Sequence, residues 1–224
     1  MKLIGTEVGR VVALMMSEDW RPQKLGAQDL IRLIQERYTF VYAPNHSLPW
    51  EEVQKGGLKF QLGKITIENR SIPIQDMTFW NDGIVINASN TKDAEEVLEN
   101  LFILAHETLG VRDLKNTGRR LFLSNLVVEF DQSINSIISK YSDFSETLNK
   151  FMEATYSVEL PMQVRSVSFH YDELTIPPWI KVAPFSIDRR LTYKYSDNRF
   201  FCEAPLRSED HLKALELFEN ILSK

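Results

Sequence analysis

The chain has 224 residues, of which 43% are hydrophobic and 25% charged, and its formal net charge is −5. This length is enough to bury a sizeable core as one large domain or two small ones. Thirteen Phe, seven Tyr and four Trp exclude a disordered chain. The single cysteine, Cys202, excludes an internal disulfide framework and a zinc site made of several cysteines.

The first residues do not resemble a secretory signal. Their apolar run extends only from Val11 to Met16, and Glu18, Asp19 and Trp20 follow it. No apolar window approaches the ~20 residues of a membrane span. We therefore expect a soluble cytoplasmic protein that does not bind membranes.

Several elements are predicted in the first third of the chain. Helical periodicity favours an amphipathic helix over residues 27–38. We expect a short strand over residues 39–44 next, and then a loop that ends near Gly57. A strand over residues 58–69 follows, and it should bend near Gly63 because glycine weakens a strand interior.

The strongest hairpin signal lies within residues 72–89. Asp82 and Gly83 tolerate the positive φ of a tight turn, so the sequence predicts them as the two loop residues. That register places Phe79 opposite Ile86 on an apolar face.

A helix is predicted over residues 90–110. Asn90 or Thr91 is the expected N-cap, and Gly110 suits the exit of the helix. The remaining predicted elements are a strand over 120–130, one or two helices over 131–154, a strand over 157–176 interrupted by Pro161, an extended linker at 177–179, and a helix over 208–222 capped by Ser208.

One long-range similarity links the two halves. A hairpin, a short polar loop and a helix with an acidic start occur around Asp82 and again around Asp197, 115 positions later. Helices often follow hairpins in α+β folds, so the pattern favours coincidence over an ancient duplication. A true duplication would imply two similar halves related by a rough two-fold axis.

The last hairpin raises a question about Arg189. With Asp197 and Asn198 as its loop, Leu191 faces Ala204, and alternation places Arg189 on the same apolar face. A charge buried there without a partner would cost several kcal/mol.

Three interpretations of Arg189 remain open. It reaches water past the sheet edge, pairs with an acid such as Asp188, Asp172 or Glu173, or binds a phosphate or carboxylate. A β-bulge near Asp188 would change the register and remove the question. Structural pairing explains most such arginines.

No catalytic signature is evident. His106 has Gly110 where a zincin needs its second histidine, and Cys202 lies on an apolar face that suits inert packing. An enzyme would draw its acid–base pair from His170, Asp172, Glu173 and His106. The sequence contains no glycine-rich phosphate loop, and no cofactor or metal is expected.

We expect an α+β fold in which antiparallel hairpins or a sheet pack against three to four helices, with two similar hairpin–helix halves as a variant. Residues 1–224 are predicted to form one compact domain, with subdomains 1–110 and 119–224 as the alternative.

The leading functional hypothesis is a non-catalytic subunit or adaptor that binds another protein in a larger complex, and a homo-oligomer is also open. Trp20, Trp50 and Trp179 are the candidate interface residues, because tryptophan is enriched at hot spots. The alternatives are an enzyme with dispersed acid–base residues and a protein that binds nucleic acid or another anion, although the negative net charge disfavours nucleic acid. The candidate anion-binding residues are Arg189, Arg190, Arg199, Arg119 and Arg120.

Overall fold

The computed structural model describes residues 1–15, 27–44, 57–80, 82–111, 114, 119–131, 139–157, 164–172, 182–190 and 192–222. The chain divides into two compact units. Unit 1 comprises Met1–Gly5, Asn125–Ala204 and Glu209–Lys224, and unit 2 comprises Thr6–Ser124 and Pro205–Ser208.

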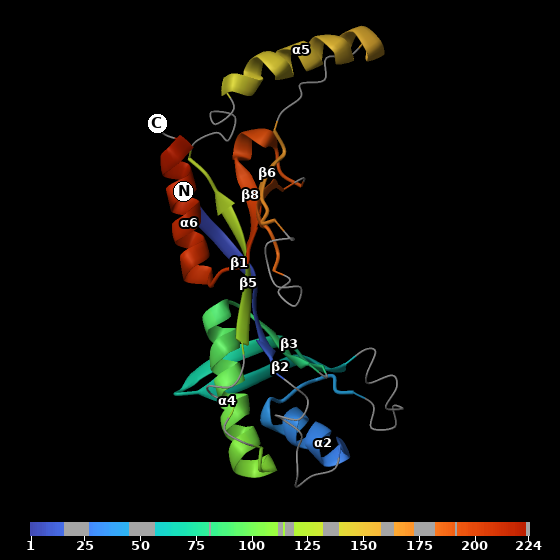
Figure 1. Cartoon of the computed structure of the whole chain (residues 1–224), viewed down its shortest axis with the longest axis vertical. Helices are drawn as coiled ribbons and strands as arrows, with labels where there is room; N and C mark the ends of the chain where they lie inside the picture. Colours follow the sequence, from blue (N-terminus) through green and yellow to red (C-terminus); the bar gives the residue numbers. More distant parts are fainter. Residues whose placement is uncertain are drawn as a thin grey trace. The chain divides into compact units, whose positions relative to one another are not determined.

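An antiparallel sheet and four α-helices make up the described part of the chain, which confirms the predicted α+β class (Figure 1). The strands are β1 (Lys2–Leu14), β2 (Leu58–Ile67), β3 (Arg70–Trp80), β4 (Gly83–Ala88), β5 (Arg119–Glu129), β6 (Ser166–Phe169), β7 (Phe185–Arg189) and β8 (Arg199–Ala204). The helices are α2 (Ala27–Arg37), α4 (Thr91–Leu109), α5 (Ser139–Tyr156) and α6 (Ser208–Leu222), and a 3-10 turn, η2, spans Tyr195–Asp197. The strand order is β2-β3-β4-β1-β5-β8-β7-β6.

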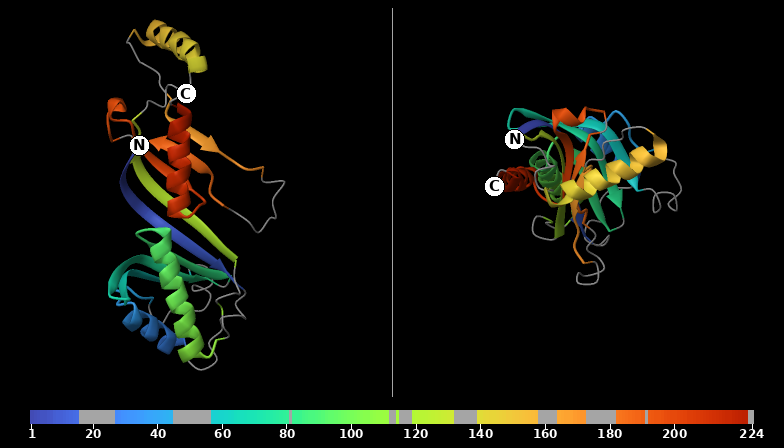
Figure 2. Two further views of the ribbon diagram at one scale, coloured as in Figure 1. Left: turned by 90° about the vertical axis from the view of Figure 1, so that its left-hand side faces the viewer. Right: turned by 90° about the horizontal axis from the view of Figure 1, so that it is seen from above.

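Alternation along the strands of unit 2 separates an apolar face from a more polar one. Val11 of β1 lies opposite Ile86 of β4, which in turn lies opposite Met77 of β3. All three side chains are buried, and the apolar residues of α2 and α4 join them in one core. Figure 2 shows α4 lying across the strands of this unit. The two helices therefore cover the same face of the sheet.

The ends of α4 follow the sequence prediction. Asn90 is its N-cap, and its side chain accepts a hydrogen bond of 2.9 Å from the Asp93 N–H. Gly110 ends the helix in the left-handed region at φ 68°.

Strand β1 passes this helix start at Gly9. A Cβ atom added to Gly9 would lie 1.9 Å from the carbonyl carbon of Asn90 and 2.1 Å from the Thr91 nitrogen. Only glycine permits such a close approach of strand and helix backbones.

The structure corrects three expectations for unit 2. The first hairpin pairs Phe79 with Ile84 instead of Ile86, because Gly83 belongs to β4 and pairs with Trp80. Residues 39–44 contribute only one isolated bridge, and the long strand β1 was not predicted.

A second hairpin, between β2 and β3, was also missed. Glu68 and Asn69 connect these strands with φ values of 49° and 64°. Glutamate is uncommon at positive φ, so this turn carries little signal in the sequence.

Unit 1 has a smaller core. It contains Leu126 and Val128 of β5, Phe130 just after that strand, Ile187 of β7, Phe200 and Cys202 of β8, and Leu215 of α6. The ring of Phe130 lies 5.3 Å from that of Phe200 and 5.8 Å from that of Phe218. Aromatic packing therefore joins the helix to the strands.

The C-terminal hairpin differs from the prediction. β7 ends at Arg189, and Ile187 rather than Tyr193 lies opposite Cys202. Turn η2 lies within the long connection to β8, so Tyr193 is in a turn and not in a strand.

The order of the described elements repeats along the chain. The series β1-α2-β2-β3-β4-α4 is followed by β5-α5-β6-β7-β8-α6, with η2 as an addition in the second series. Helices α4 and α6 begin at Thr91 and Ser208, 117 positions apart. This offset replaces the spacing of 115 derived from Asp82 and Asp197.

Candidate functional site

The five arginines proposed from the sequence as anion-binding residues fall into two groups, one in each unit. Arg119 and Arg120 begin β5 in unit 2, whereas Arg189, Arg190 and Arg199 lie at the β7–β8 hairpin of unit 1. Within the hairpin, the Arg190 N–H donates a hydrogen bond of 3.1 Å to the Arg199 carbonyl oxygen.

Arg189 is buried on the apolar strand face, as alternation predicted. It lies opposite Phe200, and its guanidinium carbon is 4.9 Å from the centre of that ring. A guanidinium over an aromatic face gains a cation–π interaction where water is excluded.

Arg190 and Arg199 also contact aromatic rings. Arg199 lies 4.7 Å from the centre of the Tyr193 ring, and Arg190 lies 5.9 Å from that of Phe201. Glu129 accepts a hydrogen bond of 3.0 Å from Arg199 Nε and raises the pKa of this guanidinium. The Glu129 carboxylate therefore neutralises part of the positive charge that an anion would need.

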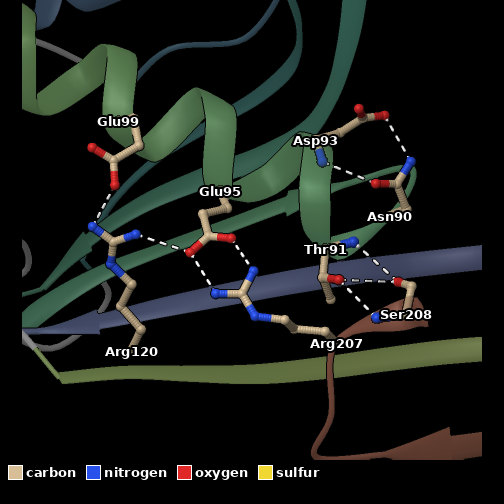
Figure 3. Close-up of polar contacts among 8 residues, drawn as sticks. All are labelled: Asn90, Thr91, Asp93, Glu95, Glu99, Arg120, Arg207 and Ser208. Carbon is tan, nitrogen blue, oxygen red and sulfur yellow. Dashed lines mark hydrogen bonds and ion pairs between the residues drawn. The ribbon is translucent and has the colours of Figure 1, made fainter. Parts of the chain in front are cut away.

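Arg120 belongs to a carboxylate network at the start of α4 (Figure 3). Arg120 Nη1 donates to Glu95 at 2.9 Å, and the same guanidinium pairs with Glu99. Arg207 donates two hydrogen bonds to the Glu95 carboxylate, the one from Nη2 at 2.8 Å, and stacks 4.2 Å from the ring centre of Phe122. The hydrogen bond from Arg207 is the main cause of the lowered pKa of Glu95, and Arg120 adds to it.

The hydroxyl groups of Thr91 and Ser208 complete this network (Figure 3). The Thr91 N–H donates to Ser208 Oγ at 3.1 Å, and the Ser208 N–H donates to Thr91 Oγ1 at 2.8 Å. Ser208 is the first residue of α6 rather than its N-cap, so its predicted role is corrected. The network ties residues 205–208 to α4, and its donors are committed to protein partners.

The described acid–base candidates are divided between the two units. His106, in unit 2, forms a hydrogen bond of 2.9 Å through Nδ1 with the carbonyl oxygen of Val111. His170, in unit 1, contacts Ser168 Oγ at 3.0 Å and is exposed. Glu173 lies outside the described residues, and Asp172 is exposed. Within the described ranges, no group of three or more His, Cys, Asp or Glu side chains has the arrangement of a metal site.

Helix α5 presents an apolar face that the sequence analysis did not single out. Phe144 and Phe151 are 63% and 64% exposed, and they lie seven positions apart on one side of the helix. Leu148 lies between them and is half-buried. Trp20, Trp50 and Trp179, the predicted interface residues, lie outside the described residues.

A polar row on the second face of the unit 2 sheet was also missed. Arg10 Nε donates to Asn87 Oδ1 at 2.8 Å, and Asn87 Nδ2 donates to Asp76 Oδ1 at 2.8 Å. The alternation of Arg10 and Val12 with Val11 was visible in the sequence. Because no strand was predicted there, the alternation could not be assigned to the two faces of a sheet.

No protein-family model matches the chain, and no curated protein matches its sequence. Among the described helices, none is long and apolar enough to span a bilayer.

Proposed function

We propose that this protein is a non-catalytic subunit or adaptor of the cytoplasm, and that it binds a protein partner through helix α5. The observation that carries this proposal is the exposure of Phe144 and Phe151 on one side of that helix. A large aromatic side chain loses favourable burial when it faces water, so two on one face favour a surface that another molecule covers.

Helix α5 differs in this respect from the other long helices. His211 and Leu215 of α6 are fully buried, whereas no α5 side chain with a described environment is buried. An amphipathic helix with an uncovered apolar face suits a partner that has an apolar groove.

Spacing along α5 defines the anchors. At 1.5 Å per residue, Phe144 and Phe151 lie about 10 Å apart along the helix axis, and Leu148 fills the interval. Truncation of an aromatic anchor at an interface costs about 2 kcal/mol or more. The partner should therefore have two aromatic-sized pockets at that separation.

Site-specific photocrosslinking in the native host tests this proposal. A photoreactive phenylalanine is placed at Phe144 or Phe151, and matched controls carry it at Glu146 or Glu153 on the opposite side of the helix. We expect one defined partner to crosslink at the phenylalanine positions and not at the glutamate positions.

Binding measurements with the purified partner complete the test. Phe144→Ser and Phe151→Ser should each weaken binding while leaving the melting temperature unchanged. Equal crosslinking at all four positions, or no crosslinked partner for a chain that remains monomeric, would contradict the proposal.

A second candidate function is the binding of nucleic acid or another anion at the β7–β8 hairpin. The aromatic contacts of Arg190 and Arg199 favour it, because bases stack on such cation–aromatic surfaces. Glu129, which pairs with Arg199, weighs against it. Affinity for a single-stranded oligonucleotide should fall steeply with salt and be lost in Arg190→Gln/Arg199→Gln. Undetectable binding at low salt would exclude this function.

A further inference from the structure

We infer that the second face of the unit 2 sheet binds an organic carboxylate with an apolar body, and that Arg10 holds the carboxylate. The site is independent of α5 and of the β7–β8 hairpin. Helices α2 and α4 cover the face of the sheet that carries Val11. Arg10 projects from β1 on the other face. The charge, orientation and surroundings of Arg10 carry this inference.

Arg10 has unused hydrogen-bonding capacity. It is half-buried, and its Nε donates to Asn87 at 2.8 Å. Within the part of the chain that the structure describes, Arg10 has no ion pair, whereas Arg70, Arg120 and Arg207 each pair with a carboxylate. A guanidinium has five N–H donors, and a carboxylate matches two parallel donors. The two terminal nitrogens of Arg10 are therefore available for a bidentate ligand.

Asn87 and Asp76 fix the orientation of this guanidinium. A carboxylate only accepts hydrogen bonds, so Asp76 must take the Nδ2 donor of Asn87, at 2.8 Å. The amide oxygen of Asn87 then faces β1, where Arg10 Nε meets it. Asn87 is 6% exposed, so the amide is held in place by its surroundings as well. Asp76 and Asn87 are positioning residues for Arg10.

The strand register places apolar residues beside this polar row. On the same face, Val12 of β1 lies opposite Val85 of β4, and Val85 lies opposite Thr78 of β3. Val12 and Val85 are half-buried. One row further, Leu14 and Trp80 flank Gly83. The face thus changes from charged to apolar along the strands, which matches a ligand with an acidic head and an apolar tail.

Octanoate is a suitable probe, and octanamide is its neutral control. The methyl groups of Val12 and Val85 are followed by NMR as each compound is added to the full chain. We expect octanoate to give saturable shifts at both valines and octanamide to bind about tenfold to a hundredfold more weakly, because it cannot form a charge-assisted pair with Arg10.

Variants identify the residue responsible. Arg10→Gln should reduce the octanoate affinity to that of octanamide, and Arg10→Lys should retain part of it because the charge remains. Arg37→Gln, which changes an exposed arginine of the same unit, should leave the affinity unchanged.

Two results would overturn the inference. One is that Arg10→Gln binds octanoate as strongly as the unmodified protein does, when melting curves show that both proteins are folded. The other is the absence of saturable shifts at Val12 and Val85. A loss of partner binding by α5 variants would affect neither measurement, so this inference and the proposed function are tested separately.

Discussion

Replacing Glu95 with glutamine removes the one carboxylate that two arginines share at the start of α4. Glu95 accepts hydrogen bonds of 2.9 Å from Arg120 and 2.8 Å from Arg207. Its side chain is 18% exposed, while those of Arg120 and Arg207 are 22% and 46% exposed. The pairs are thus partly shielded from water, and the two cations would face each other without their shared acid.

The magnitude follows from these contacts. A hydrogen bond to a charged group contributes about 1.5–3 kcal/mol, and the partial exposure of Arg207 favours the lower half of that range. We expect Glu95→Gln to lower the free energy of unfolding by about 2 kcal/mol at neutral pH. Glu99→Gln is the matched control. Glu99 is 36% exposed and pairs with Arg120 only, so its loss should cost about 0.2–1 kcal/mol.

The pH dependence provides a second readout. The pKa of Glu95 is lowered from its ordinary value of 4.5 in the folded protein, mainly by the hydrogen bond from Arg207. A lowered folded pKa contributes stability that is present above the unfolded pKa and is lost as the pH falls through the folded pKa. The difference between the unmodified protein and Glu95→Gln should therefore be constant near neutral pH and close below pH 4.5.

Urea denaturation followed by circular dichroism measures both quantities. A difference below about 0.5 kcal/mol at neutral pH would refute the reasoning, because that is the range of ordinary surface substitutions. A difference of 2 kcal/mol that persists unchanged in acid would refute the electrostatic cause, since glutamine and a protonated glutamate carry the same charge.

Three further predictions concern packing. Gly9→Ala should cost about 3 kcal/mol or more in denaturant unfolding, since its Cβ would meet helix backbone at 1.9 Å, whereas Gly5→Ala, with nothing within 4 Å, should be nearly neutral. Leu215→Ala should lower the free energy of unfolding by about 2–5 kcal/mol, because Leu215 is fully buried. Leu217→Ala, at a position that is 63% exposed, should change it by less than about 0.5 kcal/mol. Equal effects of the two substitutions would contradict the assigned buried face of α6. Burial raises the pKa of the Cys202 thiol, so a thiol reagent should label it only at the rate of unfolding, and rapid labelling of the folded protein would contradict its burial.

The elements best predicted from sequence are those with strong local signals. The helical periodicity of residues 27–38, the Asn90 cap and the Gly110 exit of α4 each appear as expected. These features depend on hydrogen bonds and side-chain spacing within a few residues of each other. The burial of Arg189 on the face of Ile187 also followed from alternation alone.

The register of the strand pairs, and the contacts between side chains distant in sequence, were harder to predict. Both hairpin registers were displaced, because a turn sequence such as Asp82-Gly83 allows more than one pairing, and long-range packing selects among them. For the candidate sites, the sequence identified Arg120 as a cation but not Glu95 and Arg207 as its neighbours. Arg207 lies 112 positions from Glu95, and no local pattern relates the two.

The sequence by itself determined the α+β class, the limits of helices α2 and α4, and the alternation that buries Arg189 beside Ile187 in β7. Those properties are local, since they depend on propensity, capping and periodicity. Only the tertiary structure decided that Gly9 lies against the start of α4, that Arg10, Asn87 and Asp76 form one row, and that Phe144 and Phe151 remain exposed. Each of these facts depends on which distant segments meet, and that is set by packing of the whole chain.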